Sequence, residues 1–395
     1  MPPALSELAL PSLVTSPPSF QSVPVVRDAP LARFPTPGFP SGAGPFRPER
    51  AAPYPHRVAS VSPAITGVSV NRLLDLPGMA DALARTEAEL RTVVESGDPF
   101  LTEVARHLID AGGKRVRPAL TVTAAQVLDA DPGVASHDVI RGGVAVELVH
   151  QGSLYHDDVM DGAETRRTVQ SVNARWGNPE AILAGDYLLA RASEIAADLG
   201  TEVAGLLAST IASLCEGQVR ELRHAFDVDR TEEAYLASIT GKTASLLSTA
   251  ARVGAIVAGH HREVIDALTD FGHHYGMAFQ VVDDLLDVVA TDDQLGKPAG
   301  NDLVEGTYTL PVIRALAGPS GSELRDLLGG PIDAATRDRV RDVIRTDEAI
   351  GATRDTAIEF LGSARGALDG LPANPSVGTM QATCDLLLDR LDGSF

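Results

Sequence analysis

The stretch ELVHQGSLYHDDVMDGAETRR, residues 147–167, sets acidic residues inside an apolar run whose spacing is helical. Asp157 and Asp161 stand four residues apart, so a helix places both on one face, with His150 two turns earlier on it. Like charges at this spacing repel, and a carboxylate among Leu, Val and Met is costly unless a positive charge joins it. The stretch therefore predicts a helix whose carboxylates bind a divalent cation.

A second stretch, FQVVDDLLD at residues 279–287, repeats this acidic pattern. One such cluster on a helix is usually a solvated face, but two copies in similar apolar settings are harder to explain in that way. Facing each other in a helical bundle, they would form a negative well for several Mg²⁺ ions. Because Mg²⁺ takes only one or two carboxylates and completes its shell with water and phosphate, we expect a ligand rich in phosphate. The six aspartates are Asp157, Asp158, Asp161, Asp283, Asp284 and Asp287.

Composition excludes several classes of protein. The 395 residues carry a net charge of -20, and so acidic a chain offers no basic stripe for a nucleic acid. The two cysteines, Cys215 and Cys384, suggest neither a disulfide framework nor a zinc site, so a reducing, cytoplasmic location is expected. No uncharged apolar run reaches the roughly 18 residues of a membrane-spanning helix.

Residues 1–70 are expected to be a disordered tail, because fifteen of the 26 prolines fall there. An organelle transit peptide is the alternative for this acid-poor segment. From residue 71 the apolar spacing is helical almost throughout, without a convincing strand period, which predicts one all-α domain over 71–395, a single large bundle of ten or more helices. The expected helices cover 71–95 with an irregularity at Gly78, 99–110, 118–130, 138–161, 179–199 after a cap at Asn178, 202–226, 231–240, 243–258 and 261–289.

Lysine is rare in this chain: of the 33 lysines and arginines, three are lysines, and each follows a glycine. Lysine binds phosphate as a compact point charge, so Lys114, Lys242 and Lys297 are candidate phosphate ligands, unless they are chance survivors of a composition biased against lysine. Gly241-Lys242-Thr243 is not a phosphate loop, because Leu236 replaces the first glycine and no strand precedes it. A break in a helix that aims Lys242 into a cavity fits better.

Two further stretches can be interpreted either as binding sites or as ordinary structural segments. GGKRVRP, residues 112–118, is an anion cradle built from Lys114, Arg115 and Arg117, or a basic helix end that complements the dipole. GKPAGNDLVEGTYTLP, residues 296–311, is an ordered loop whose lysine returns to a diphosphate, or a plain surface loop.

Together these stretches resemble the trans-type polyprenyl diphosphate synthases, the head-to-tail prenyltransferases, from about residue 112 to 311. In that family the fold is an all-α bundle around a deep central cavity, the isoprenoid synthase fold, usually in a homodimer. The matching pieces are GGKRVRP, ELVH and HDDVMD with Arg166-Arg167, GDYLLARA around Asp186, GKT, FQVVDDLLD, and GKPAGNDL with TLP. Two residues depart from the family pattern: Thr168 stands where glycine is usual, and Thr307 where lysine is frequent.

The resemblance implies two substrates, isopentenyl diphosphate and an allylic diphosphate, and two or three Mg²⁺ ions. Asp157, Asp161 and Asp283 resemble the metal ligands, while Asp158, Asp284 and Asp287 resemble supporting residues. Lys114, Arg117, His150 and Arg167 resemble the isopentenyl diphosphate site. Arg166, Lys242 and Lys297 resemble the residues that grip the allylic diphosphate, and Thr243 and Gln280 those at the reacting end. Phe279 and Tyr155 are candidate walls for the carbocation, and diphosphate itself is the expected proton acceptor.

Product length is expected to follow from the tunnel floor, where the family places bulky residues four and five positions before the first aspartate. Here Ser153 and Gly152 are small and Val149, a turn further back, is modest, which predicts an open tunnel and a long polyprenyl product such as a quinone side chain. On this assignment Gly152→Tyr shortens the product, and the alternative is that large residues from another helix close the tunnel. The alternatives are a geranylgeranyl diphosphate synthase, a non-catalytic partner subunit that sets length, and a terpene cyclase.

Overall fold

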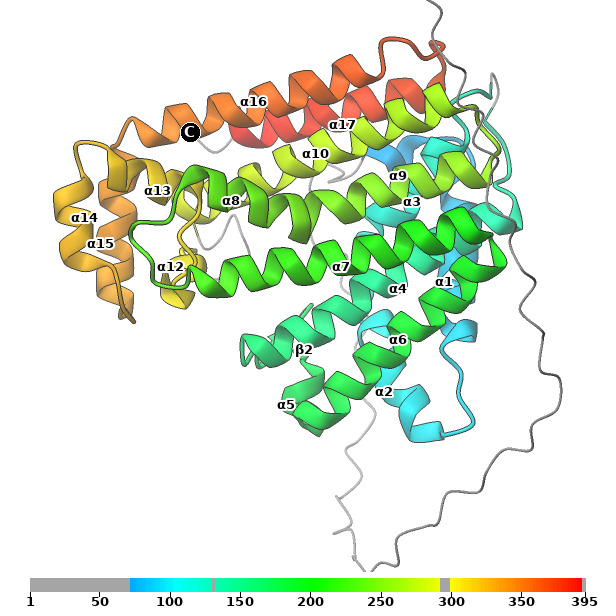
Figure 1. The fold of residues 1–395 in the computed structure, drawn as a ribbon, viewed down its shortest axis with the longest axis horizontal. Coiled ribbons are helices and arrows are strands. Elements are labelled where there is room, and N and C mark those ends of the chain that lie inside the picture. Colours follow the sequence, from blue (N-terminus) through cyan, green and yellow to red (C-terminus); the bar gives the residue numbers. More distant parts are fainter. Residues whose placement is uncertain (1–71, 130–131, 292–298, 393–395) are drawn as a thin grey trace, which may run out of the picture. The chain divides into compact units, whose positions relative to one another are not determined.

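Helices make up almost all of the described chain in this computed structural model, which covers residues 72–129, 132–291 and 299–392 (Figure 1). The expected tail, residues 1–70, and Lys297 lie outside the described residues. In chain order the helices are the 3₁₀ turn η1 (Arg72–Asp75), α1 (Met79–Val93), α2 (Pro99–Asp110), α3 (Val116–Ala125), α4 (His137–Met160), α5 (Val172–Trp176), α6 (Asn178–Asp198), α7 (Thr201–Arg223), α8 (Glu232–Ile239), a π-helical turn (Thr240–Ala244), α9 (Ser245–Val257), α10 (Arg262–Val289), α12 (Asn301–Glu305), α13 (Leu310–Ala317), α14 (Gly321–Leu327), α15 (Ala334–Arg345), α16 (Ala349–Ala367) and α17 (Pro375–Asp392).

The all-α prediction is confirmed, with one small exception. Strands β1 (Thr165–Arg166) and β2 (Val169–Gln170) form an antiparallel hairpin directly after α4. Two residues per strand are too few to produce a period-2 pattern, so the sequence held no signal for this hairpin.

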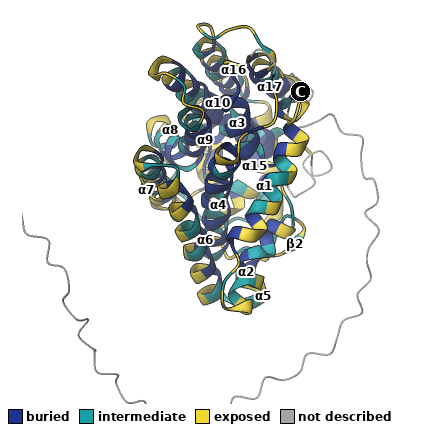
Figure 2. Ribbon diagram, turned by 90° about the vertical axis from the view of Figure 1, so that its right-hand side faces the viewer, coloured by how far each residue is buried: buried dark blue, intermediate teal, exposed yellow. Residues whose placement is uncertain are grey.

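The two helices that carry the aspartates lie at the centre of the bundle. Helix α4 packs against α3, α6 and α9, while α10 packs against α9 and α16. Figure 2 shows dark, buried ribbon on α3, α4, α9 and α10, with exposed residues on the outer helices. The polar groups on α4 and α10 are therefore held in an apolar surrounding, which is where a carboxylate is most costly.

Several helix starts follow capping chemistry that is visible in the sequence. Asp98 is the N-cap of α2 and accepts a hydrogen bond from Phe100 N at 2.8 Å, and Pro99 is the first residue of the helix. Thr231 caps α8 in the same way and accepts a hydrogen bond from Ala234 N at 3.1 Å. The expected cap at Asn178 is wrong. Gly177, with φ 113°, takes the N-cap position and Asn178 is already the first residue of α6.

The expected break before Lys242 is a π-helical turn. Helix α8, residues 240–244 and α9 follow one another directly, so the chain stays helical from 232 to 257. A π-helical turn inserts extra backbone and changes the direction of the side chains that follow. This turn presses against α7: a Cβ on Gly217 would lie 2.5 Å from the Lys242 backbone nitrogen, and one on Gly241 would lie 2.6 Å from the Ser213 carbonyl oxygen.

Gly217→Ala is expected to lower the free energy of unfolding by about 1–3 kcal/mol, because backbone fills the space that its Cβ needs. The separation of α7 from the π-helical turn also displaces Lys242, so catalytic activity falls in the folded fraction. Urea denaturation and activity measurements check both effects. The matched control is Gly205→Ala on the same helix, where nothing lies within 4 Å of the new Cβ. An equal loss of stability in both variants would contradict this account.

Candidate active site

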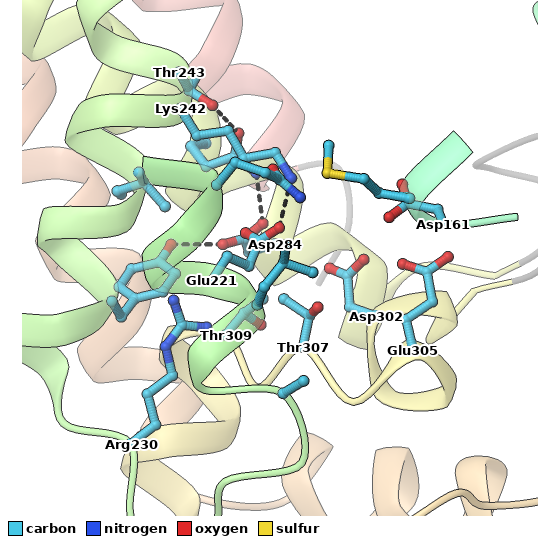
Figure 3. A pocket seen from close by; sticks show the side chains of 17 residues that line it. Asp161, Glu221, Arg230, Lys242, Thr243, Asp284, Asp302, Glu305, Thr307 and Thr309 are labelled. Carbon is cyan, nitrogen blue, oxygen red and sulfur yellow. Dashed lines mark hydrogen bonds and ion pairs between the residues drawn. The ribbon is translucent and has the colours of Figure 1, made fainter. Parts of the chain in front are cut away.

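A polar cavity of about 330 Å³ lies where α4 ends, between α7, α8 with the π-helical turn, α10 and α12 (Figure 3). It brings together residues from both acidic stretches, Asp161 from the first and Asp284 from the second. Lys242 reaches the same space from the π-helical turn. The other polar lining residues are Gln218, Glu221, Arg230, Tyr235, Thr243, Gln280, Asp302, Glu305, Thr307 and Thr309.

The three aspartates of the first stretch face different surroundings. Asp161 lines the polar cavity, and Asp157 lines a second cavity beside it. Asp158 is fully buried and its Oδ1 accepts hydrogen bonds from Arg166, from Nε at 2.8 Å and with Nη2 at 2.6 Å. Arg166, which the resemblance assigned to the allylic diphosphate, is thus engaged with Asp158 in this state.

In the second stretch Asp284 is the aspartate that faces the polar cavity. Its carboxylate accepts hydrogen bonds from Tyr235 Oη at 2.6 Å and Gln280 Nε2 at 2.8 Å. Gln280 Oε1 in turn accepts from Thr243 Oγ1 at 2.7 Å. This chain of bonds brings Thr243 and Gln280 together at the cavity, as expected of two residues that line the same reacting end.

Asp283 and Asp287 point elsewhere. Asp283 lies 3.6 Å from Arg390 of α17 in an ion pair, and Asp287 Oδ2 accepts a 3.4 Å hydrogen bond from the Asp302 backbone at the start of α12. The resemblance gave Asp283 a direct metal-binding role and Asp284 a supporting one. In the structure Asp284 is the member of the pair that lines the cavity.

Burial raises the pKa of two of these carboxyls. For Asp157 the pKa rises to about 6, since burial outweighs the opposing effect of Lys242, and Asp161 adds repulsion. For Asp284 burial raises the pKa to about 7, against the hydrogen bonds from Tyr235 and Gln280. Both shifts express the cost of a buried negative charge without a full positive partner.

These donors fit Mg²⁺ that arrives with a diphosphate. Within the described residues no three His, Cys, Asp or Glu side chains converge as a complete metal-binding set. Mg²⁺ does not require such a set, because water and phosphate oxygens supply most of its ligands. Carboxylates whose negative charge is costly, on two helices around one cavity, would hold the metal at Asp157 and Asp161 on one side and at Asp284 on the other.

Helix α7 contributes functional candidates that sequence reasoning missed. Lys242 Nζ donates to Glu221 Oε1 at 2.5 Å, so a seventh carboxylate belongs to the site. Gln218, one turn earlier, lines both cavities. The sequence signal for these two residues was weak, because a polar pair such as Gln218 and Glu221, three residues apart on a long helix, is typical of a solvated face. Arg230, Asp302 and Glu305 also line the polar cavity without having been expected there.

Three of the basic residues assigned to isopentenyl diphosphate, His150, Arg117 and Arg167, lie close enough for their charges to interact. The pKa of His150 is well below its usual value because of burial first and then the positive charges of Arg117 and Arg167. Arg167 donates to the Leu108 carbonyl at 3.0 Å, and Arg117 Nε is buried without a hydrogen-bond partner among the described residues. Such a cluster favours an anion. Lys114 lies exposed in the adjoining loop.

Arg115, by contrast, belongs to the core. Its guanidinium donates to Glu87 Oε1 at 2.5 Å and Glu147 Oε1 at 2.8 Å, and its side chain is 4% exposed. Arg115 therefore ties the loop to α1 and α4. The anion cradle that the sequence suggested loses this member.

A second cavity of about 430 Å³ lies between α4, α6 and α7. Of the three residues predicted to set product length, Ser153 lines it. Val149 is fully buried in the core, and Gly152 sits where α4 crosses α6, with the site of its Cβ 3.0 Å from the Gly185 carbonyl. The apolar side chains around this cavity are Val159, Met160, Ile182, Leu214, Val219 and Leu222.

Two expectations change accordingly. Gly152 serves close helix contact, so Gly152→Tyr is expected to force α4 and α6 apart instead of shortening the product. Tyr155 does not wall the site: it is fully buried and its Oη donates to the Val104 carbonyl of α2 at 2.8 Å. Phe279 is half-buried, with its ring 6.3 Å from that of Tyr275, and does not line either described cavity.

The structure gives a physical reason for the glycine that the family usually has at position 168. Arg167 and Thr168 form the turn of the hairpin with φ values of 52° and 66°, both left-handed. Two-residue hairpin turns of this kind favour Asn and Gly, and a β-branched residue is strained there. Thr307, the other departure, lines the polar cavity with a hydroxyl where a lysine is frequent.

Thr168→Gly is expected to raise the free energy of unfolding by about 1 kcal/mol, because glycine adopts this turn without the left-handed penalty. Thermal or urea unfolding measures the change. The matched control, Thr165→Gly in β1, removes a threonine from an ordinary strand position and should lower stability by about 0.5–1 kcal/mol. A loss of stability in both variants would argue against strain at Thr168.

Asp284→Asn is expected to raise the free energy of unfolding of the metal-free protein at pH 8. The difference between variant and wild type should be roughly 2 to 4 kcal/mol larger at pH 8 than at pH 5. The folded pKa of about 7 lies above the ordinary 3.8, so the stability contributed by the protonated group is present below pH 4 and lost as pH rises through 7. Urea unfolding in EDTA at both pH values gives the difference. A pH-independent difference between variant and wild type would contradict the raised pKa.

The fold and site define an all-α protein with a polar cavity, lined by carboxylates and a lysine, beside a second, apolar one. Residues 98–346 match the family model for polyprenyl synthetase. A nonaprenyl diphosphate synthase of Mycobacterium tuberculosis is 37% identical over 330 residues, covering 82% of this chain and 97% of that protein. The chain therefore belongs to the polyprenyl synthetase family, and it is a polyprenyl diphosphate synthase, a prenyltransferase of isoprenoid biosynthesis.

Two further relatives agree. The heptaprenyl diphosphate synthase component 2 of Geobacillus stearothermophilus is 38% identical over 304 residues, 77% of this chain and 94% of that protein. A geranylgeranyl pyrophosphate synthase of Corynebacterium glutamicum, solved with calcium and isoprenyl diphosphate, is 38% identical with a TM-score of 0.70, covering 80% of this chain and 96% of that chain. No helix within the described ranges is both long and apolar enough to span a bilayer.

Proposed function

We propose that this synthase condenses isopentenyl diphosphate with an allylic diphosphate in the presence of Mg²⁺ and releases a long trans-polyprenyl diphosphate. The observation that carries the proposal is the pairing of the two cavities. Met160, Gln218, Leu222 and Lys242 line both of them, so the polar cavity and the apolar cavity meet at a shared wall. An allylic diphosphate fits this arrangement with its head in the first and its hydrocarbon tail in the second.

The polar cavity would hold the leaving diphosphate. Bound there by Asp161 and Asp284, with Asp157 reaching it from the adjoining cavity and the other three aspartates in support, Mg²⁺ would stabilise the charge that develops on the departing group. Lys242 exchanges its Glu221 partner for a phosphate oxygen, and Lys297 is proposed to join it. Thr243 and Gln280 lie at the same cavity, where their oxygens face the reacting end.

The basic cluster would hold isopentenyl diphosphate. Arg117 and Arg167 supply fixed positive charge, and Lys114 closes over the anion from the exposed loop. His150 is uncharged at neutral pH, because its pKa lies well below the usual value. His150 can therefore donate a hydrogen bond to the anion without adding a positive charge that would repel Arg117 and Arg167.

Product length is proposed to exceed geranylgeranyl, because Ser153 puts a small side chain into an apolar cavity. The named relatives include nonaprenyl and heptaprenyl synthases on one side and a geranylgeranyl synthase on the other. We further propose a homodimer. Action as a length-setting subunit of a two-component enzyme is the alternative, since one relative carries the name component 2.

Ser153→Phe is expected to shorten the product, because a ring in the apolar cavity takes the room of the growing chain. The purified protein is incubated with Mg²⁺, farnesyl diphosphate and labelled isopentenyl diphosphate, and the alcohols are sized after phosphatase treatment. Wild type should give a ladder ending beyond geranylgeraniol, and the variant a shorter one. The control is Ser193→Phe, at an exposed position of α6 outside both cavities.

Other outcomes of this assay separate the alternatives. A wild-type product that stops at geranylgeranyl keeps the chemistry and refutes the long-chain proposal. Incorporation that needs a second protein component favours the partner-subunit interpretation. A cyclic hydrocarbon formed without consumption of isopentenyl diphosphate would refute the condensation itself.

A further inference from the structure

Gln218 of α7 occupies the wall that the two cavities share. Apart from Lys242, it is the polar residue that lines both of them, and the other shared lining residues, Met160 and Leu222, are apolar. A substrate with its head in the polar cavity and its tail in the apolar cavity passes this wall at the bond between them. That bond is the one that breaks in the reaction, between C1 of the allylic chain and the diphosphate oxygen.

The amide of Gln218 is unusual for a buried polar group. The residue is 8% exposed, and its Oε1 is shielded from water without a hydrogen-bond donor among the described residues. A buried carbonyl oxygen without a partner is costly, and most such groups in folded proteins find one. The carbonyl of Gln280, the other glutamine at the site, is already occupied by Thr243 Oγ1 at 2.7 Å.

The reaction creates a positive charge at this place. The C1–O bond breaks with its electron pair leaving on diphosphate, and the allylic fragment becomes a cation spread over C1 and C3. The double bond of isopentenyl diphosphate then forms the new bond to C1, and the proton lost from that unit leaves with diphosphate. A cation in a dry site is stabilised by a dipole aimed at it, provided that the group is too weak a nucleophile to trap it.

We propose that Gln218 is a catalytic residue whose amide oxygen faces the allylic cation where the two cavities meet. The proposal deepens the proposed function and rests on the head-and-tail placement of the substrate. A neutral amide suits this position, because its oxygen offers a dipole to the cation without the full negative charge that would let a carboxylate trap it. The oxygen that lacks a donor in the free protein gains its partner when the charge forms.

The main test compares Gln218→Met, a chain of similar length without the carbonyl, with wild type in a single condensation. The kcat should fall by about a hundredfold to a thousandfold, the range seen when a group that stabilises transition-state charge is removed. The KM for both substrates should stay within about twofold, because the dipole acts on the charge of the transition state. Binding of inorganic diphosphate with Mg²⁺, measured by calorimetry, should also stay unchanged.

Two further variants keep the result interpretable. Gln218→Asn retains a neutral amide oxygen near the position and should keep more of the kcat than Gln218→Met. Glu216→Leu is the matched control, a polar-to-apolar change two residues away on the same helix, exposed and outside both cavities, and it should leave kcat unchanged. If Gln218→Met unfolds, as judged by circular dichroism, Gln218→Leu replaces it.

The outcomes distinguish this proposal from the one on which it rests. An unchanged kcat in folded Gln218→Met overturns the catalytic assignment while the synthase activity stands. A raised KM or weaker diphosphate binding at constant kcat also overturns it, since the amide then anchors the substrate. Loss of kcat in Gln218→Asn equal to that in Gln218→Met does the same. A wild-type protein that condenses nothing overturns both proposals.

Discussion

The structure depends on the repulsion between carboxylates that two central helices bring close together, with Asp158, Asp284 and Asp287 buried and Asp161 exposed at the end of α4. Four of these aspartates have partners among the described residues: Asp158 pairs with Arg166, Asp284 with Tyr235 and Gln280, Asp283 with Arg390, and Asp287 with the Asp302 backbone. Asp157 and Asp161 have Lys242 nearby, but that ammonium is bound to Glu221. The free site therefore retains negative charge that no described partner neutralises, and we propose that this charge attracts a metal-bound diphosphate.

Close backbone contact at glycines gives this electrostatic arrangement its geometry. The π-helical turn with Lys242 lies against Gly217 of α7, too near for any side chain between them. That contact sets Glu221 within 2.5 Å of the lysine and puts Gln218 into the wall between the two cavities. The polar cavity and the apolar cavity thus share one boundary, which is where we propose that the reacting bond lies.

Much of this could be predicted from the sequence, because the signals were local. The repeated aspartate spacing, the helix period and the helix that follows Thr231 each depend on neighbours in the chain, and all lie where they were expected. What failed depended on which neighbouring helix a side chain meets. Arg115 looked like a phosphate ligand until Glu87 and Glu147 came beside it, and Gly152 looked like a tunnel floor until α6 crossed it. For the same reason the sequence did not indicate Gln218 and Glu221 of α7, which reach the site only because α7 contacts the π-helical turn.

The measurement that tests the central claim most directly is the thermal stability of the wild-type protein with Mg²⁺ alone, inorganic diphosphate alone, and both together. The account predicts a small change with either ligand alone and a large rise in Tm with both, because each supplies the charge that the other lacks. The rise should disappear in Asp157→Asn. Equal stabilisation by diphosphate with and without Mg²⁺ would contradict the account, because diphosphate would then bind without a metal ion between it and the aspartates.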